Sequence, residues 1–235
     1  MAENGLHKMA VHLPRRDAIG EANDALDRHV EILKKVRSIH IDQNSTKEGF
    51  LYLSASPMIY SAWEGFFRLS CSICLRRKCQ RGKIAKKYPE LYSTLWLQKE
   101  PFLDQFLAKL FNSMTPGKDA SKPTSGKFSA IAILTAGIST WLHKPLSHTI
   151  NFDKLVMTYS NVKPDVVKLN ASVIGLDINT IDLTGLDDLL RSRNNIAHGG
   201  LVTNPTELET EVLLDYTEKL LRQFHAAVLV WIKAN

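Results

Sequence analysis

The sequence predicts an all-α protein, a helical bundle with a helical insertion in its middle. Apolar residues recur at spacings of three and four in the first and last segments of the 235-residue chain, which is the period of a helix with one buried face. Strand-type alternation is scarce, and no Asn-Gly or Asp-Gly turn joins β-rich segments. A hydrophobic content of 44% is enough for a proper core.

The first helix is expected to follow a flexible N-terminus, residues 1–16, which lacks the continuous apolar core of a signal peptide. One domain then spans residues 17–235. The apolar stripe of this helix consists of Ile19, Ala22, Leu26, Val30, Leu33 and Val36.

A second, longer helix is expected over residues 47–81. It contains Ser56-Pro57, and this dipeptide is compatible with two structures. One is an N-cap followed by a proline in the first turn, and the other is a kink inside a continuous helix.

The middle of the chain, residues 82–158, is the predicted helical insertion. It is expected to contain two short helices within 91–111, a polar loop at 112–127 and a buried helix at 131–142. The two short helices divide at Glu100-Pro101, because a residue before proline is biased away from the helical backbone.

The last helix has a clear N-terminal signal. Thr206 is a capping residue, and Glu209 follows at the position of a capping-box partner. Its buried stripe is expected to contain Leu213, Leu220, Phe224, Val228 and Trp231.

Three cysteines, Cys71, Cys74 and Cys79, lie close together in the second predicted helix. An odd, clustered count does not indicate a disulfide framework. A zinc site is the alternative, but no nearby histidine or second cysteine pair completes four ligands. We therefore expect buried free thiols, with no bound metal and no cofactor.

The chain is mildly basic, with 30 Lys and Arg against 24 Asp and Glu, a net charge of +6. This balance is compatible with a polyanionic partner. One run is especially basic, and it can either track an RNA backbone, with Tyr88 available for stacking, or form a solvated face. The run contains Arg76, Arg77, Lys78, Arg81, Lys83, Lys86 and Lys87.

No apolar run approaches the roughly 18 residues that a membrane span requires. We therefore expect no membrane association and a cytoplasmic protein.

The most informative segment is residues 190–200, at the end of an apolar helix. It brings together the guanidinium of Arg193, the amide of Asn194 and the imidazole of His198, just before Gly199-Gly200, which can end the helix. A guanidinium binds phosphate through two parallel hydrogen bonds, and an imidazole transfers protons near neutral pH. These groups are sufficient in principle to cleave RNA.

Arg193-Asn194-x-x-x-His198 resembles the Arg-polar-x(3)-His signature of HEPN domains (higher eukaryotes and prokaryotes nucleotide-binding), and the chain is similar to the RiboL-PSP-type subgroup. The resemblance extends to residues 60–68, 160–163 and 174–177, and to the capped helix that follows. It covers about two thirds of the chain and leaves residues 82–158 unaccounted for.

The resemblance implies a bundle of four or five helices, a homodimer with a composite active site, and metal-independent endoribonuclease activity. Arg193 and His198 match the catalytic pair, Asn194 matches the polar position beside the arginine, and Glu64 matches an acidic residue of the early helix. The implied partners are RNA and an antitoxin or other regulatory protein, in toxin–antitoxin or anti-phage systems. Products would carry a 2′,3′-cyclic phosphate.

Two alternatives stand beside this hypothesis. Arg193 can be a surface residue, with His198 capping the last carbonyls of the helix. The domain can also be a non-catalytic HEPN module that binds nucleic acid or a protein.

Overall fold

The computed structural model describes residues 13–44, 46–47, 49–80, 82–114, 124–146, 150–159, 161–197 and 204–235, with the side chains of 195–197 left aside. Eight α-helices and no strand occur within these ranges, which confirms the all-α class. The chain divides into two compact units. We call His12–Lys78 with Asn151–Asn235 the bundle unit, and the unit built around Cys79–Ile150 the middle unit.

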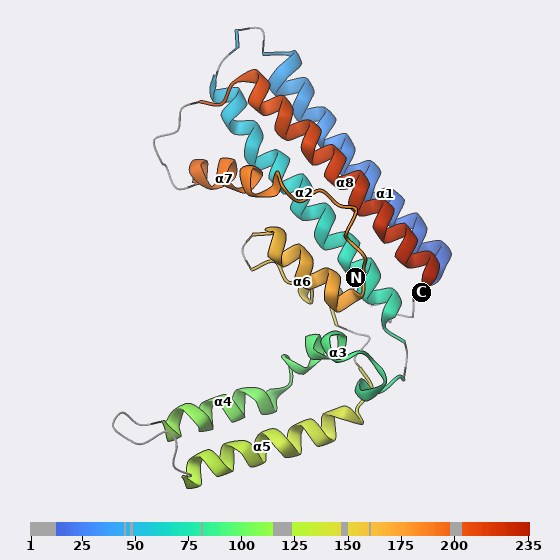
Figure 1. The fold of residues 1–235 in the computed structure, drawn as a ribbon, viewed down its shortest axis with the longest axis vertical. Coiled ribbons are helices and arrows are strands. Elements are labelled where there is room, and N and C mark those ends of the chain that lie inside the picture. Colours follow the sequence, from blue (N-terminus) through green and yellow to red (C-terminus); the bar gives the residue numbers. More distant parts are fainter. Residues whose placement is uncertain are drawn as a thin grey trace, which may run out of the picture. The chain divides into compact units, whose positions relative to one another are not determined.

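The described part of the bundle unit contains five α-helices, in agreement with the predicted four to five. Three long helices, with α1 antiparallel to the other two, lie side by side, and the two shorter helices contact α2 (Figure 1). The five are α1 (Arg15–Arg37), α2 (Gly49–Lys78), α6 (Pro164–Ile174), α7 (Leu186–Ala197) and α8 (Glu207–Ala234). Helix α1 includes Arg15 and Arg16, which the prediction assigned to the N-terminal segment before the first helix.

Helix α2 is the centre of this unit, because it contacts α1, α6, α7 and α8. Its apolar residues surround the helix on most sides, as expected for a helix that is buried by several neighbours. Trp63 and Phe67 of α2 pack against Phe224 of α8, with ring centroids 5.8 and 5.4 Å apart, and all three side chains are completely buried. Aromatic burial of this kind dominates core energetics.

Helix α2 continues through Pro57, eight residues after its first residue, so the interpretation of Ser56-Pro57 as a helix start is wrong. The helix begins instead at Gly49, just after Lys47 adopts a left-handed backbone with φ of 52°. Asn204 of the segment before α8 lies against Gly49, where a β-carbon would come within 2.6 Å of the Asn204 side chain. The N-terminus of α2 is therefore in contact with the segment that precedes α8.

The middle unit contains α3 (Glu90–Leu97), α4 (Pro101–Ser113) and α5 (Ser125–Leu142), which confirms the break at Glu100-Pro101. The prediction of a buried helix at 131–142 is wrong in one respect. The helix exists, but only Ala130 and Trp141 of α5 are buried. Within this unit α4 runs alongside α5 (Figure 1), and a single neighbouring helix covers only one side of an apolar helix.

All three cysteines are buried thiols, as expected, and none of them forms a disulfide. Burial raises the pKa of Cys74 to about 12 and the pKa of Cys71 in the same direction, so both thiols stay protonated. Cys79 follows the end of α2 rather than lying in it. In the part of the chain that the structure describes, no group of three or more His, Cys, Asp or Glu side chains could hold a metal ion.

None of the helices described is both long and apolar enough to cross a membrane.

The predicted capping box is present at the start of α8. The Thr206 hydroxyl accepts a hydrogen bond from the Glu209 backbone N–H at 3.2 Å, and the Glu209 carboxylate accepts one from the Thr206 backbone N–H at 2.8 Å. Thr206→Ala should lower the free energy of unfolding by about 1 kcal/mol, because it removes the hydroxyl that accepts from the Glu209 N–H, one of the free N–H groups at the start of the helix. Urea denaturation followed by circular dichroism measures this. An equal loss in the exposed control Thr180→Ala would contradict it.

His29 of α1 lies against Gly65 of α2, where a β-carbon would be 3.0 Å from the imidazole Nε2. Burial lowers the pKa of His29; the hydrogen bond to the Ala25 carbonyl opposes this shift, and nearby Arg28 adds to it. Burial also lowers the pKa of His225 in α8. Both imidazoles are therefore more difficult to protonate in the folded chain than in the unfolded chain.

The contribution of these two histidines to the free energy of unfolding should therefore be fully present above the ordinary histidine pKa of 6.5. It should decrease as the pH falls from there toward the lowered pKa values of the folded chain, because the unfolded chain takes up the protons first. Urea denaturation at pH 7.5 and 5.5 checks this. The fall should be smaller in His29→Gln/His225→Gln than in the wild-type chain or in the exposed control His143→Gln. An equal fall in all three proteins would contradict the prediction.

Candidate functional site

Helix α7 carries Arg193 and Asn194, and it is fixed to the bundle by its apolar side. Leu186, Leu189 and Leu190 are buried. The Ser192 hydroxyl donates a hydrogen bond to the Ser56 hydroxyl of α2 at 2.8 Å. The next residue, Arg193, is half-buried beside α2. Packing of α7 therefore places the guanidinium over a defined part of α2.

The Arg193 guanidinium is held by neutral groups. Its Nη1 donates to the side-chain oxygen of Asn161 at 3.1 Å and to that of Asn194 at 2.9 Å. Its Cζ lies 5.5 Å from the centroid of the Tyr60 ring, within the range of a cation–π contact. No carboxylate of the described chain forms an ion pair with it, so the guanidinium is positioned by neutral groups.

Asn161 is held in turn through the next residue, Val162. The Val162 N–H donates to the Tyr60 hydroxyl at 2.7 Å, and the Trp63 indole N–H donates to the Val162 carbonyl at 3.4 Å. Tyr60, Trp63 and Val162 are all buried. We call these two hydrogen bonds the Val162 clamp. The clamp attaches the segment before α6 to α2 and thereby brings Asn161 to the guanidinium.

Glu64 joins the same cluster from one turn further along α2. Burial is the main cause that raises the pKa of Tyr60 to about 12, and the Glu64 carboxylate, which accepts a hydrogen bond from the phenol, raises it further. The Val162 N–H and Arg193 act in the opposite direction. The phenol therefore stays protonated at physiological pH and continues to donate to Glu64.

Three of the predicted site residues, Glu64, Arg193 and Asn194, thus meet in one cluster. The structure adds Tyr60 and Asn161, which the prediction did not select as functional, although both lie in segments that carried the resemblance. The side-chain oxygen of Asn194 accepts a hydrogen bond from Arg193, and its amide N–H groups have no partner in the described chain.

His198, with Gly199 and Gly200, lies outside the described residues. The structure describes α7 as far as Ala197.

The basic run does not form one free surface. Arg77 is buried and donates to the Leu13 carbonyl at 3.0 Å, Lys78 donates to the Ile174 carbonyl at 2.6 Å, and Arg76 forms an ion pair with Glu21. These three side chains therefore have structural contacts at the end of α2.

The rest of the run belongs to the middle unit, except Arg81, which lies outside the described residues. Lys83 lies 4.4 Å from the centroid of the Tyr88 ring, and Lys86 and Lys87 are exposed. Tyr88 itself is buried, with its ring 5.0 Å from that of Tyr92, so the expectation that it is available for base stacking is wrong.

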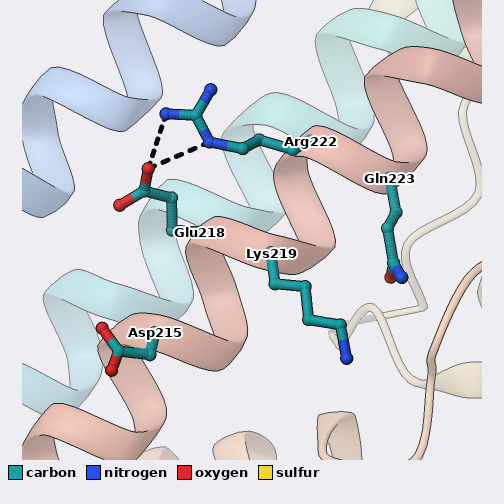
Figure 2. Close-up of a pocket in the computed structure, with 5 residues that line it drawn as sticks. All are labelled: Asp215, Glu218, Lys219, Arg222 and Gln223. Atoms are coloured by element: carbon teal, nitrogen blue, oxygen red, sulfur yellow. Dashed lines mark hydrogen bonds and ion pairs between the residues drawn. The ribbon is translucent and has the colours of Figure 1, made fainter.

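A shallow surface pocket also lies along α8, and it has a different character. Figure 2 shows that its five lining residues all project from this one helix, with Arg222 donating to the Glu218 carboxylate at 2.6 Å. The charge of Arg222 is therefore already compensated. Groups from separate elements, as around Arg193, are more typical of a functional site.

A comparison with known protein families gives a match over most of the chain. The family model described as RiboL-PSP-HEPN matches residues 23–229. The chain belongs to the RiboL-PSP-HEPN family. The matched range extends over residues 82–158 as well, which the quoted motifs left unaccounted for, so the HEPN match is wider than the expected two thirds.

Comparisons with curated proteins and with solved structures found no match. Membership in the HEPN family supports a nucleic-acid-related role.

The Val162 clamp gives a test of how this HEPN site is held together. Tyr60→Phe removes the acceptor of the buried Val162 N–H, and an unsatisfied buried donor costs about 1–3 kcal/mol. Urea denaturation should show a loss of unfolding free energy in this range. The control Tyr159→Phe removes the hydroxyl of an exposed tyrosine and should be close to neutral. Equal stabilities of the two variants would contradict the clamp.

Proposed function

We propose that this HEPN protein is a metal-independent endoribonuclease in which Arg193 and His198 form the catalytic pair. The observation that supports this most strongly is the state of Arg193. Its guanidinium is oriented by two asparagine oxygens and an aromatic face, and no described carboxylate forms an ion pair with it. A guanidinium in this state favours phosphate over a neutral ligand.

The proposed reaction uses the nucleophile that RNA itself carries. The 2′-hydroxyl attacks the adjacent phosphorus, and the bond to the 5′-oxygen of the next nucleotide breaks. His198 removes the 2′-hydroxyl proton or protonates the departing 5′-oxygen, a contribution of about 10²–10⁴-fold for a positioned group. Arg193 stabilises the charge on the phosphorane oxygens, and Asn194 can donate its free amide N–H groups to the same phosphate.

In this proposal Glu64 is a positioning residue. Its carboxylate fixes the Tyr60 phenol, whose ring faces Arg193 and whose hydroxyl accepts from Val162. Loss of Glu64 therefore acts on the orientation of the guanidinium.

The proposal includes a homodimer, in which two copies of α7 contribute two Arg193–His198 pairs to a composite active site. It also includes a regulatory partner, such as an antitoxin, because uncontrolled RNA cleavage in the cytoplasm would harm the host cell. The proposed biological role is that of a toxin or of an anti-phage defence nuclease.

The activity can be tested with purified protein, end-labelled RNA and EDTA. Cleavage should persist in EDTA, leave 2′,3′-cyclic phosphate ends and spare DNA, which lacks the 2′-hydroxyl. Arg193→Ala and His198→Ala should each reduce the rate by roughly 10²-fold or more.

Arg191→Ala is a matched control, because Arg191 lies on the same helix but is exposed and pairs with Asp188 at 3.1 Å. It should keep the wild-type rate. RNA binding without cleavage by the wild-type chain would favour the non-catalytic HEPN module instead.

A further inference from the structure

A second feature of the bundle unit is a groove between α1 and α2. Two neighbouring surface pockets share His29 as a lining residue. One is mainly apolar, with Ile32, Pro57 and Met58 in its wall. The other is charged and is lined by Arg28 and Arg68, with Asp153 nearby. We call the two pockets together the α1–α2 groove.

The charged end of the groove carries two available cations. Arg28 and Arg68 are both exposed, and neither forms a hydrogen bond or an ion pair within the described ranges. This distinguishes them from Arg37, Arg76, Arg191 and Arg222, each of which pairs with a carboxylate. Asp153 compensates at most one of the two charges. The end of the groove therefore keeps a net positive charge that suits an anion.

His29 contributes a hydrogen-bond acceptor. Its Nδ1 lies 2.7 Å from the Ala25 carbonyl oxygen, which can only accept, so Nδ1 must carry the proton. The neutral imidazole then has a lone pair on Nε2, next to Gly65 in the wall of the same pocket. A hydroxyl group is a suitable donor for such a nitrogen, and RNA carries one on every ribose.

The groove is related to the Arg193 site through one side of α2. Tyr60, Glu64 and Arg68 follow one another at intervals of four residues, and each step turns only about 40° around the helix. Arg68 therefore lies about 12 Å along the axis from Tyr60 and on a neighbouring face. At 3.4 Å per nucleotide, that distance corresponds to roughly three or four stacked nucleotides.

We propose that the α1–α2 groove is a flanking subsite for single-stranded RNA, in which Arg28 and Arg68 bind backbone phosphates and His29 accepts a hydrogen bond from a ribose hydroxyl. The substrate class rests on the proposed function. The subsite holds the strand outside the bond that is cut, so that the scissile phosphate reaches Arg193.

The charged part of the subsite is tested by the salt dependence of binding. A labelled 12-nucleotide RNA is titrated with the full chain carrying His198→Ala, which removes the proposed proton-transfer group. For single strands, log K falls with log salt with a slope of about −0.7 per phosphate contact. Arg28→Ala/Arg68→Ala should weaken binding and make the slope less steep by about 1.4.

Arg191→Ala/Arg222→Ala is the matched control, because both arginines are exposed and already ion-paired. It should leave the slope unchanged. Thermal unfolding by circular dichroism verifies that both double variants are folded. The same slope in the two double variants would overturn the subsite.

The ribose contact is tested by Gly65→Ala, which places a methyl group 3.0 Å from Nε2 without changing any charge. It should reduce the preference for RNA over DNA of the same sequence and leave the salt slope unchanged. An unchanged preference would overturn the role of His29.

These results separate the subsite from the nuclease. If wild-type protein does not cleave RNA but binding depends on Arg28 and Arg68, the nuclease proposal fails and the subsite stands. If cleavage depends on Arg193 and His198 while the Arg28/Arg68 variant binds normally, the subsite fails alone.

Discussion

The backbone of Val162 is the point on which the arrangement of the site depends. Tyr60 accepts a hydrogen bond from its N–H and Trp63 donates one to its carbonyl, so two side chains of α2 satisfy both backbone polar groups of one buried residue. A buried backbone group without a hydrogen-bond partner costs free energy, so the loss of either bond would destabilise the fold. Trp63 also packs against Phe224 in the core. The core and the site are therefore built on the same helix, and displacement of α2 would affect both.

The chemical consequence concerns the charge of Arg193. Two exposed arginines of the described bundle, Arg191 and Arg222, pair with carboxylates of their own helix. Arg193 instead contacts two amide oxygens and an aromatic ring, which orient a guanidinium without cancelling its charge. Partial burial strengthens the attraction between such a cation and an anion, because the local dielectric is lower than that of water. This is the property that a site for a transferring or cleaved phosphate requires.

The features that could be predicted from the sequence are those that depend on neighbouring residues. The capping box at Thr206 and the division at Glu100-Pro101 depend on residues a few positions apart, and both are present. Burial was less predictable. Helix α5 has the composition of a buried helix, but composition does not specify how many neighbours a helix has, and α4 covers only one side of it. Pro57 shows the same limit, since local rules allow either a helix start or a position inside a continuous helix there, and the packing around α2 decides for the continuous helix.

The site contains both residues that the sequence could predict and residues that only the structure reveals. Arg193, Asn194 and Glu64 could be selected because they match a spaced motif. Asn161 and Tyr60 could not, because their contacts with Arg193 join segments that are distant in the chain and arise only when α2, α6 and α7 pack together. A tyrosine or an asparagine does not by itself indicate a functional site. A tyrosine among apolar residues is more often part of a core, and an asparagine before a helix is more often part of a turn.

The central claim is that Asn161 acts through Arg193, and a double-mutant cycle tests it most directly. The affinity of the His198→Ala chain for a short RNA is measured with Asn161→Ala, Arg193→Ala and both together. Each single substitution should weaken binding, and the double variant should bind no worse than Arg193→Ala alone, because Asn161 has no effect once the guanidinium is gone. Additive losses, or normal binding by Arg193→Ala, would contradict the account.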